Sequence, residues 1–213
     1  MGIEYPGAAE GRSAPELENA AWASVEVPLS PQRLHDFLAD TGRLFRLNPH
    51  LEIEAWLPQD AGTRTYRWSA LNETNGCRSE VCMRAEALVE NAGWTLHYDA
   101  GLKRATEFRI AAAAGGSLLT VTDHYHPVPN GSDERLKEVD RSLIPWTGAI
   151  RRHLAGLARF GGMPGYRWWM ECVMLGMPPR QRRIVRMIVW VSVLEFVVFL
   201  FVALIYVLES GRS

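Results

Sequence analysis

Hydrophobic and polar residues follow a strand period and then a helical period at the start of the chain. A strand-length run at Ala21–Pro28 precedes Ser30-Pro31, where serine can cap a helix and proline fits the first helical position. Apolar residues then recur at helical spacing as far as Leu47, with an interruption at Thr41-Gly42. The pattern predicts one strand and two short helices that end before Pro49.

Six strand-length runs follow, each separated from the next by a short segment rich in glycine, asparagine or aspartate. Consecutive runs with such short connections are typical of antiparallel hairpins. The predicted strands are Leu51–Leu57, Thr63–Leu71, Arg78–Val89, Trp94–Tyr98, Ala105–Ala112 and Leu118–Tyr125.

A long helical pattern comes next, from Asp133 to Phe160. Its apolar residues recur at helical spacing, which predicts one apolar face, and Pro145 predicts a kink. That face includes Leu136, Val139, Leu143, Trp146, Ile150, Leu154 and Leu157. Residues 1–19, in contrast, are polar and rich in glycine, proline and alanine, which predicts a disordered tail.

The most hydrophobic segment runs from Met187 to Leu208, where only Ser192 and Glu195 are polar among 22 residues. As an α-helix it is about 33 Å long, enough to cross a hydrocarbon core of about 30 Å. Its aliphatic and phenylalanine residues contribute roughly 5 to 10 kcal/mol towards insertion, which exceeds the cost of about 3 kcal/mol for one central ionisable residue. The sequence therefore predicts a C-terminal membrane anchor, and it argues against a purely soluble protein and against a polytopic transporter.

The net charge of −1 conceals an uneven distribution. Residues 1–160 contain 17 basic and 21 acidic residues, whereas residues 161–213 contain six and three. The arginines gather just before the apolar segment, so the positive-inside rule predicts residues 1–180 in the cytoplasm and a short tail, residues 209–213, across the membrane. No strong, clustered basic surface of the kind that binds nucleic acid is present.

Two further features concern the compartment. The first residues lack the basic and apolar regions of a signal peptide. Cys77, Cys82 and Cys172 have neither an even number nor a metal-binding spacing, so we expect reduced, small buried side chains. Arginine outnumbers lysine by 21 to 2, as in many GC-rich bacterial genomes. We therefore expect a single-pass protein of a bacterial inner membrane with its soluble domain in the cytoplasm.

The connection between the predicted domain and the anchor is rich in aromatic residues and arginine. Trp168 and Trp169 are predicted to lie at headgroup depth, followed by Arg180, Arg182 and Arg183 at the membrane surface. The alternative is a linker that packs on the soluble body.

The order of elements, together with the segment VPLSPQRLHDFLADTGRLFRLNPHLEIEAW, resembles the START/Bet v 1-like superfamily, also called SRPBCC. The segment is similar to the opening strand and helix pair of polyketide cyclase-like and coenzyme Q-binding members. The resemblance covers Ala21 to Phe160 and implies an α+β helix-grip fold, in which a curved antiparallel sheet surrounds a long C-terminal helix. The resemblance gives a helix-grip domain at residues 20–160, and the hydropathy pattern adds an interfacial linker at 161–183 and a transmembrane helix at 184–208.

Such a fold implies a cavity between the sheet and the helix, suited to a hydrophobic ligand such as a lipid or a quinone-like molecule. No other cofactor is expected. The alternative is that the same side chains simply fill the core. The residues predicted to line the cavity are Tyr66, Trp68, Met83, Trp94, Tyr98, Phe108, Tyr125, Leu143 and Trp146.

Candidate catalytic residues are few. His97, His124 and His126 could form an acid/base pair or part of a metal site, but no third ligand has suitable spacing, and we expect no metal. No Ser/His/Asp or Cys/His arrangement and no phosphate-binding loop is recognisable. A polyketide cyclase-like activity therefore ranks below a role without catalysis.

Glu195 is the polar feature of the anchor that demands an explanation, because an ionisable residue inside a membrane helix is by default a candidate functional residue. It could contact a polar group on another membrane subunit, or it could be a protonated residue tolerated in a very hydrophobic helix. Two roles remain nearly level: binding and presenting a hydrophobic molecule at the membrane, and serving as an accessory subunit of a membrane redox complex.

Overall fold

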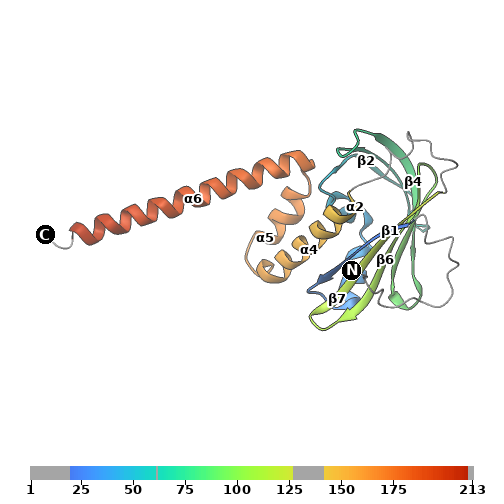
Figure 1. Ribbon diagram of the computed structural model, residues 1–213, viewed down its shortest axis with the longest axis horizontal. Coiled ribbons are helices and arrows are strands. Elements are labelled where there is room, and N and C mark those ends of the chain that lie inside the picture. Colours follow the sequence, from blue (N-terminus) through green and yellow to red (C-terminus); the bar gives the residue numbers. More distant parts are fainter. Residues whose placement is uncertain (1–19, 61, 127–141, 211–213) are drawn as a thin grey trace, which may run out of the picture. The chain divides into compact units, whose positions relative to one another are not determined.

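The computed structural model describes residues 20–60, 62–126 and 142–210. They fall into two compact units with a boundary between Arg167 and Trp168. The first unit contains the sheet and the second is helical (Figure 1). The tail predicted at residues 1–19 lies outside the described residues, and the domain limits expected from the sequence stay predictions.

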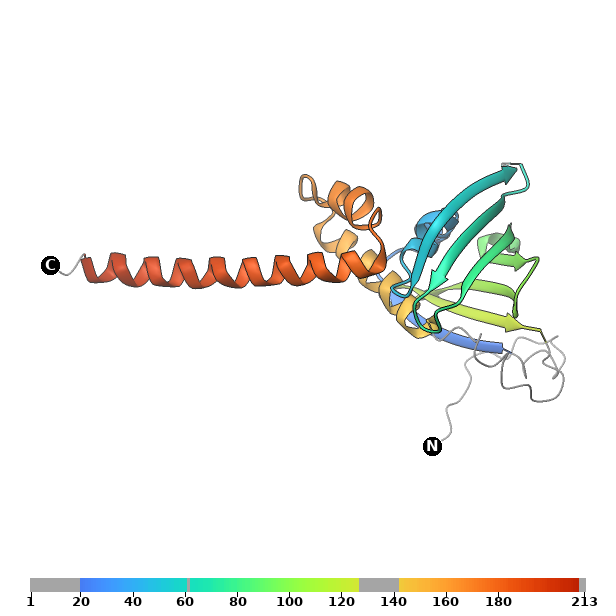
Figure 2. The same ribbon diagram turned by 90° about the horizontal axis from the view of Figure 1, so that it is seen from above.

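The first unit is built on a curved, seven-stranded antiparallel sheet with the order β1-β7-β6-β5-β4-β3-β2 (Figure 2). From β2 to β7 each strand pairs with the next along the chain, and β1 closes the order by pairing with β7. The predicted strands are confirmed, with their ends moved by a few residues. Their bounds are β1 Ala20–Val27, β2 Leu51–Asp60, β3 Thr65–Asn72, β4 Arg78–Ala87, β5 Gly93–Tyr98, β6 Lys103–Ala113 and β7 Gly116–Tyr125.

Two short helices, α1 (Pro31–Leu38) and α2 (Thr41–Arg46), lie between β1 and β2, as the sequence predicts. The interruption predicted at Thr41-Gly42 is wrong, because both residues lie inside α2. The break comes earlier because Asp40 caps α2: its Oδ1 accepts a hydrogen bond of 3.0 Å from the Arg43 amide.

The long helix of the first unit is α4 (Leu143–Phe160), which contacts β1 and β7. It buries one face against the sheet, including Trp146, Ile150 and Leu154. Pro145 lies in its first turn, where the missing N–H has no helical partner to lose, so it interrupts no helical hydrogen bond there. The predicted part of the helix at residues 133–141, with Leu136 and Val139, lies outside the described residues.

One tight approach fixes the sheet where β5 begins. Gly93 has a φ of 143°, and a Cβ at this position would lie 1.8 Å from the Phe108 carbonyl oxygen. Only glycine fits such a position. The short 3-10 turn η2 (Val89–Asn91) precedes it.

The cysteines differ from expectation. Cys77 and Cys172 are exposed and Cys82 is half-buried, and all three thiols are free. The expectation of buried cysteines is wrong because Cys77 lies in the turn before β4, and Cys82 lies opposite Arg67, away from the core-facing residues of β4.

The second unit begins within α5 (Tyr166–Trp168) and continues through a π-helical segment, η3 (Trp169–Met174), to α6 (Pro179–Ser210). At 32 residues, α6 is long and apolar enough to cross a membrane. Its length of about 48 Å exceeds a hydrocarbon core of about 30 Å, so the polar residues of its first turns can remain outside that core.

Candidate functional site

A cavity of about 510 Å³ lies between the inner face of the sheet, α2 and α4, and its volume is typical of a small-molecule site. We call the face of the sheet that α4 covers the inner face. Alternate residues of each strand point towards it. The described lining includes Phe45, Asn48, Leu51, Trp68, Asn72, Ser79, Val81, Tyr98, Leu102, Lys103, Tyr125 and Trp146.

Three aromatic rings from different elements form the apolar wall of this cavity. The ring centroid of Phe45 lies 5.2 Å from that of Trp68 and 5.2 Å from that of Trp146. The indole N–H of Trp146 donates a hydrogen bond of 2.9 Å to the Leu44 carbonyl, so its one polar group is satisfied within the protein. The wall is therefore both apolar and fixed in position.

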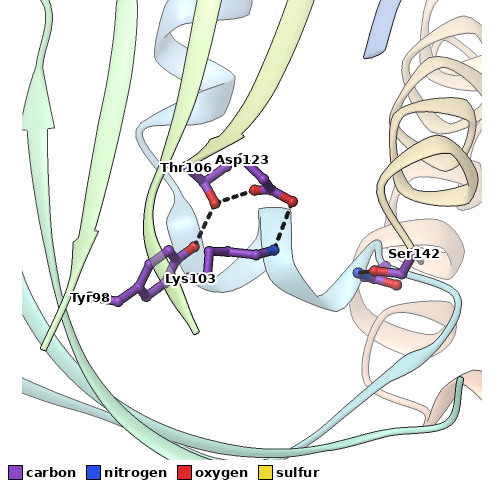
Figure 3. A network of polar contacts seen from close by, with 6 residues as sticks. Tyr98, Lys103, Thr106, Asp123 and Ser142 are labelled. Atoms are coloured by element: carbon purple, nitrogen blue, oxygen red, sulfur yellow. Dashed lines mark hydrogen bonds and ion pairs between the residues drawn. The ribbon is translucent and has the colours of Figure 1, made fainter. Parts of the chain in front are cut away.

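A network of polar side chains lies where β5 ends and β6 begins (Figure 3). Tyr98 Oη donates to Thr106 Oγ1 over 3.0 Å, and Thr106 Oγ1 donates to Asp123 Oδ1 over 2.5 Å. The second carboxylate oxygen, Oδ2, lies 2.8 Å from Lys103 Nζ. Tyr98 and Lys103 line the cavity, so this network gives the lining a charged, hydrogen-bonded region in addition to the aromatic wall.

Asp123 anchors the network and is fully buried, with an exposed fraction of 0%. A carboxylate in such a position requires a counter-charge and hydrogen bonds, because its desolvation is costly. Lys103 supplies the charge and Thr106 the hydrogen bond, one to each oxygen. The register of the sheet brings them together, since Thr106 lies directly opposite Asp123 and an irregularity between Lys103 and Ala105 shifts the start of β6.

A second polar contact, also drawn in Figure 3, secures the start of α4 beside the cavity. Asn48 Nδ2 donates a buried hydrogen bond of 2.7 Å to Ser142 Oγ. Asn48 itself lines the cavity. The bond ties the segment after α2 to the residue before α4, so the two helices that close the cavity hold each other in place.

Four of the residues predicted as cavity lining lie in the lining: Trp68, Tyr98, Tyr125 and Trp146. They come from β3, β5, β7 and α4, and the fold brings them together although they are far apart in the sequence. Whether they bind a ligand stays a prediction.

The other five lie outside that lining. Met83 and Phe108 are core residues with exposed fractions of 1% and 0%, and Leu143 is buried at the start of α4. Tyr66 packs on Trp56 with their ring centroids 5.4 Å apart, and the Trp94 indole donates to the His35 carbonyl over 3.2 Å. These side chains have packing partners within the protein.

The sequence did not predict several residues of the cavity lining, such as Phe45, Asn48 and Lys103. These residues lie in turns or outside the alternating pattern of the strands. The only signal for Asn48 was its position before Pro49, and Lys103 stood out only as one of two lysines in the chain.

The histidines occupy another part of the sheet. His97 and His124 line a pocket of about 440 Å³ on the outer face, whose described lining does not include the residues of the cavity network. His124 Nε2 lies 3.5 Å from Glu107 Oε2, and Arg109 pairs with the other oxygen of Glu107. His126 follows the end of β7 and so does not continue the strand. Among the residues described, no group of three or more potential ligands is placed to hold a metal ion.

The residues predicted at the membrane all lie in or beside the helices of the second unit. Trp168 and Trp169 are exposed by 62% and 38%. Arg180, Arg182 and Arg183 lie at the start of α6, where Arg182 Nε donates to the Met177 carbonyl over 2.8 Å. Glu195 lies near the middle of α6 and is exposed on the helix. Their contacts with a membrane stay predictions.

No family model and no curated protein sequence matches this chain. Solved structures do resemble it. A START superfamily protein from Mycobacterium smegmatis has 17% identity and a TM-score of 0.51, over 65% of this chain and 98% of that one. The Zhui aromatase/cyclase from Streptomyces sp. R1128 has 16% identity and a TM-score of 0.51, over 67% of this chain and 97% of that one.

At these identities the likeness concerns the fold, and the likeness covers about two thirds of this chain but nearly the whole of each solved structure. The strand order and the long helix α4 against the sheet match what the sequence resemblance implies. The first unit of this chain therefore has the helix-grip fold of the START/Bet v 1-like (SRPBCC) superfamily.

Proposed function

We propose that this chain is a membrane-anchored protein without catalytic activity that binds a hydrophobic molecule, a lipid or a quinone-like compound, and presents it at the cytoplasmic face of a bacterial inner membrane. The cavity would hold the molecule, and α6 would keep the helix-grip domain beside the bilayer in which such molecules dissolve. A membrane enzyme next to the chain would be the recipient.

The observation that carries this proposal is the presence of both features in one chain. The cavity of about 510 Å³ has an aromatic wall of Phe45, Trp68 and Trp146. The same chain carries a 32-residue helix that is apolar enough to cross a membrane. The anchor would keep the cavity beside the bilayer, so the domain would meet a membrane-dissolved ligand without diffusing through the whole cytoplasm.

The polar network would orient the ligand. The Lys103 ammonium and the Tyr98 phenol line the same cavity as the aromatic wall of Phe45, Trp68 and Trp146. An amphiphile with an oxygen-bearing head and an apolar body would place its head at Lys103, because a few polar groups in an apolar site fix orientation.

The proposal is tested by purifying the full chain in mild detergent and identifying bound molecules by mass spectrometry after extraction. The matched variants are Ser79→Trp, which fills the cavity from β4, and Ser69→Trp, at a strand position directed away from the lining of the cavity. We expect a hydrophobic molecule in near-stoichiometric amount in the wild type and in Ser69→Trp, and its loss in Ser79→Trp. A wild type that carries only detergent, or equal loading of both variants, would contradict the proposal.

A second candidate function rests on Glu195. The 22 residues Met187–Leu208 contain one acidic residue, and the described part of α6 has no basic residue after Arg186. A carboxyl group in a membrane helix is stabilised by a polar or basic partner on another subunit. In this role the chain would be an accessory subunit of a membrane complex.

This second role predicts co-purification with other membrane subunits in mild detergent. Glu195→Leu should weaken that association. Val197→Leu, which changes a nearby uncharged residue of α6, should leave it intact. A chain that elutes alone, with no difference between the two variants, would remove this candidate.

A further inference from the structure

We propose that the first unit carries a second binding site, separate from the cavity, for the phosphate group of an anionic membrane phospholipid. The site is a pocket between α1, α2 and the C-terminal half of α4, here called the arginine pocket. It is lined by Arg33, Arg43, Arg167, Asp36, Phe37 and Leu157, among others. The inference rests on the membrane anchoring in the proposed function and on nothing that concerns the cavity ligand.

Charge is the first argument. Three arginines and one acidic residue line the described part of the pocket, whose volume is about 410 Å³. The acidic residue, Asp36, already accepts from Gln32 Nε2 over 3.2 Å and lies 3.7 Å from His35 Nδ1. Guanidinium groups match the geometry of phosphate oxygens and bind them through paired hydrogen bonds. The pocket therefore favours an oxyanion.

Shape and order are the second argument. The guanidinium of Arg43 lies over the Phe37 ring, 4.6 Å from its centroid, which holds the arginine at the pocket wall. Phe37 and Leu157 supply apolar surface beside the arginines. Apolar surface beside the held Arg43 suits the junction of a phosphate head and an acyl chain better than it suits a fully hydrated inorganic ion.

Chain connectivity is the third argument. Arg167 is followed directly by Trp168 and Trp169, and α6 begins at Pro179. Pro179 follows Arg167 by 12 residues. Even a fully extended chain of this length spans at most about 40 Å. An anchored chain therefore keeps this pocket close to the lipid surface, where anionic headgroups attract basic side chains.

A structural role for the arginines is the competing explanation. Helix α4 ends at Phe160, and the Gly161 amide bonds to the Leu157 carbonyl over 2.9 Å at the pocket. Basic side chains near a helix C-terminus stabilise the helix dipole. That role predicts lower thermal stability when the arginines are replaced, with no change in lipid binding.

Native mass spectrometry of the full chain released from detergent micelles tests the proposal. The probes are dioleoyl phosphatidylglycerol, dioleoyl phosphatidylcholine and glycerol 1-phosphate. The test variant is Arg33→Gln/Arg43→Gln, and the control is Arg46→Gln/Arg151→Gln, which removes the same charge from exposed positions of α2 and α4 outside the pocket. The arginines in the first turns of α6, Arg180, Arg182, Arg183 and Arg186, are unchanged in both.

We expect the wild type and the control to bind one phosphatidylglycerol at least about tenfold more tightly than phosphatidylcholine, and the test variant to lose that preference. If the test variant and the control prefer phosphatidylglycerol equally, the arginine pocket is not the binding site, and lipid binding is assigned to the arginines in the first turns of α6. Glycerol 1-phosphate binding as tightly as the lipid would overturn the membrane lipid as the occupant.

Two controls separate this proposal from the proposed function. Carbonate extraction of membranes shows whether the wild type is anchored, and lipid extraction shows whether its cavity is loaded. If the chain is not anchored, the proposed function is contradicted. The preference for phosphatidylglycerol measured in micelles still shows whether the arginine pocket binds the lipid. A reduced melting temperature in the test variant with unchanged lipid preference supports the structural role and overturns the proposal.

Discussion

Asp123 and Glu195 are two acidic residues in different environments: Asp123 is buried in the sheet of the first unit, and Glu195 is exposed on an apolar helix. Asp123 has an exposed fraction of 0%, and both of its carboxylate oxygens have partners in Lys103 and Thr106. Glu195 lies in an apolar helix whose side chains are exposed over its membrane-length segment. The fold explains a buried charge whose partners lie in the same chain, whereas the membrane position proposed for Glu195 would call for a polar partner outside α6.

The largest expected effect comes from breaking the network at Asp123. Asp123→Asn leaves the Lys103 ammonium without its counter-charge and should lower the free energy of unfolding of the first unit by about 3 kcal/mol, the lower end for a buried pair because Lys103 is partly exposed. Denaturant unfolding of the full chain in mild detergent measures it, with the exposed Glu80→Gln as control. Equal unfolding midpoints for the two variants would show that the pair contributes little.

A smaller effect is expected at Thr106. Thr106→Val keeps the shape of the side chain but removes the donor to Asp123 Oδ1 and the acceptor for Tyr98 Oη. The loss should be about 1 to 2 kcal/mol. Thr122→Val, on a residue of β7 directed away from the core, is the control in the same unfolding assay, and an unfolding curve for Thr106→Val that overlays this control would contradict the assigned network.

At Glu195 the expected change in the stability of the first unit is smaller still. Glu195→Leu should alter its free energy of unfolding by less than about 0.5 kcal/mol, since surface changes outside a folded unit have little effect on it. Retention in carbonate-washed membranes should be at least as strong as in the wild type, because the substitution removes a cost of about 3 kcal/mol for insertion. Destabilisation comparable to that of Asp123→Asn would mean that Glu195 is paired within the chain.

Asp60 extends the comparison to a carboxylate in water and should give the smallest effect. The Thr63 hydroxyl donates to Asp60 Oδ2 over 2.8 Å and the Gly62 amide to Oδ1 over 2.9 Å, and these bonds hold the pKa of Asp60 below its ordinary value. A lowered pKa contributes stability above the unfolded-state pKa, which is lost as the pH falls through the folded value. Side-chain NMR titration should find the lowered pKa, and Thr63→Val should raise it; an ordinary pKa in both would refute the turn geometry.

The strands and helices of the first unit were predictable from the sequence because their signals are local. Alternation and short turns located β2 to β7, and Ser30-Pro31 located the start of α1. Errors arose where two local signals competed: glycine suggested a break at Thr41-Gly42, but the cap at Asp40 decided the helix start.

The candidate site was predictable only in part. Trp68 and Trp146 follow from alternation and from the helical face, whereas Lys103 does not, because its contact with Asp123 depends on the register between β6 and β7. Alternation also cannot distinguish a side chain that lines a cavity from one that fills the core, as Met83 and Phe108 show. The difference depends on how closely neighbouring elements approach.

By itself the sequence determined the order of strands and helices and the helix apolar enough to cross a membrane, because hydrophobic periodicity acts over a few residues. Only the tertiary structure decided the cavity, the Asp123 network and the arginine pocket. Each of these joins residues from elements distant in the chain, such as Arg33 of α1 and Arg167 beyond α4. Packing and strand register, which bring such residues together, are set by the whole fold.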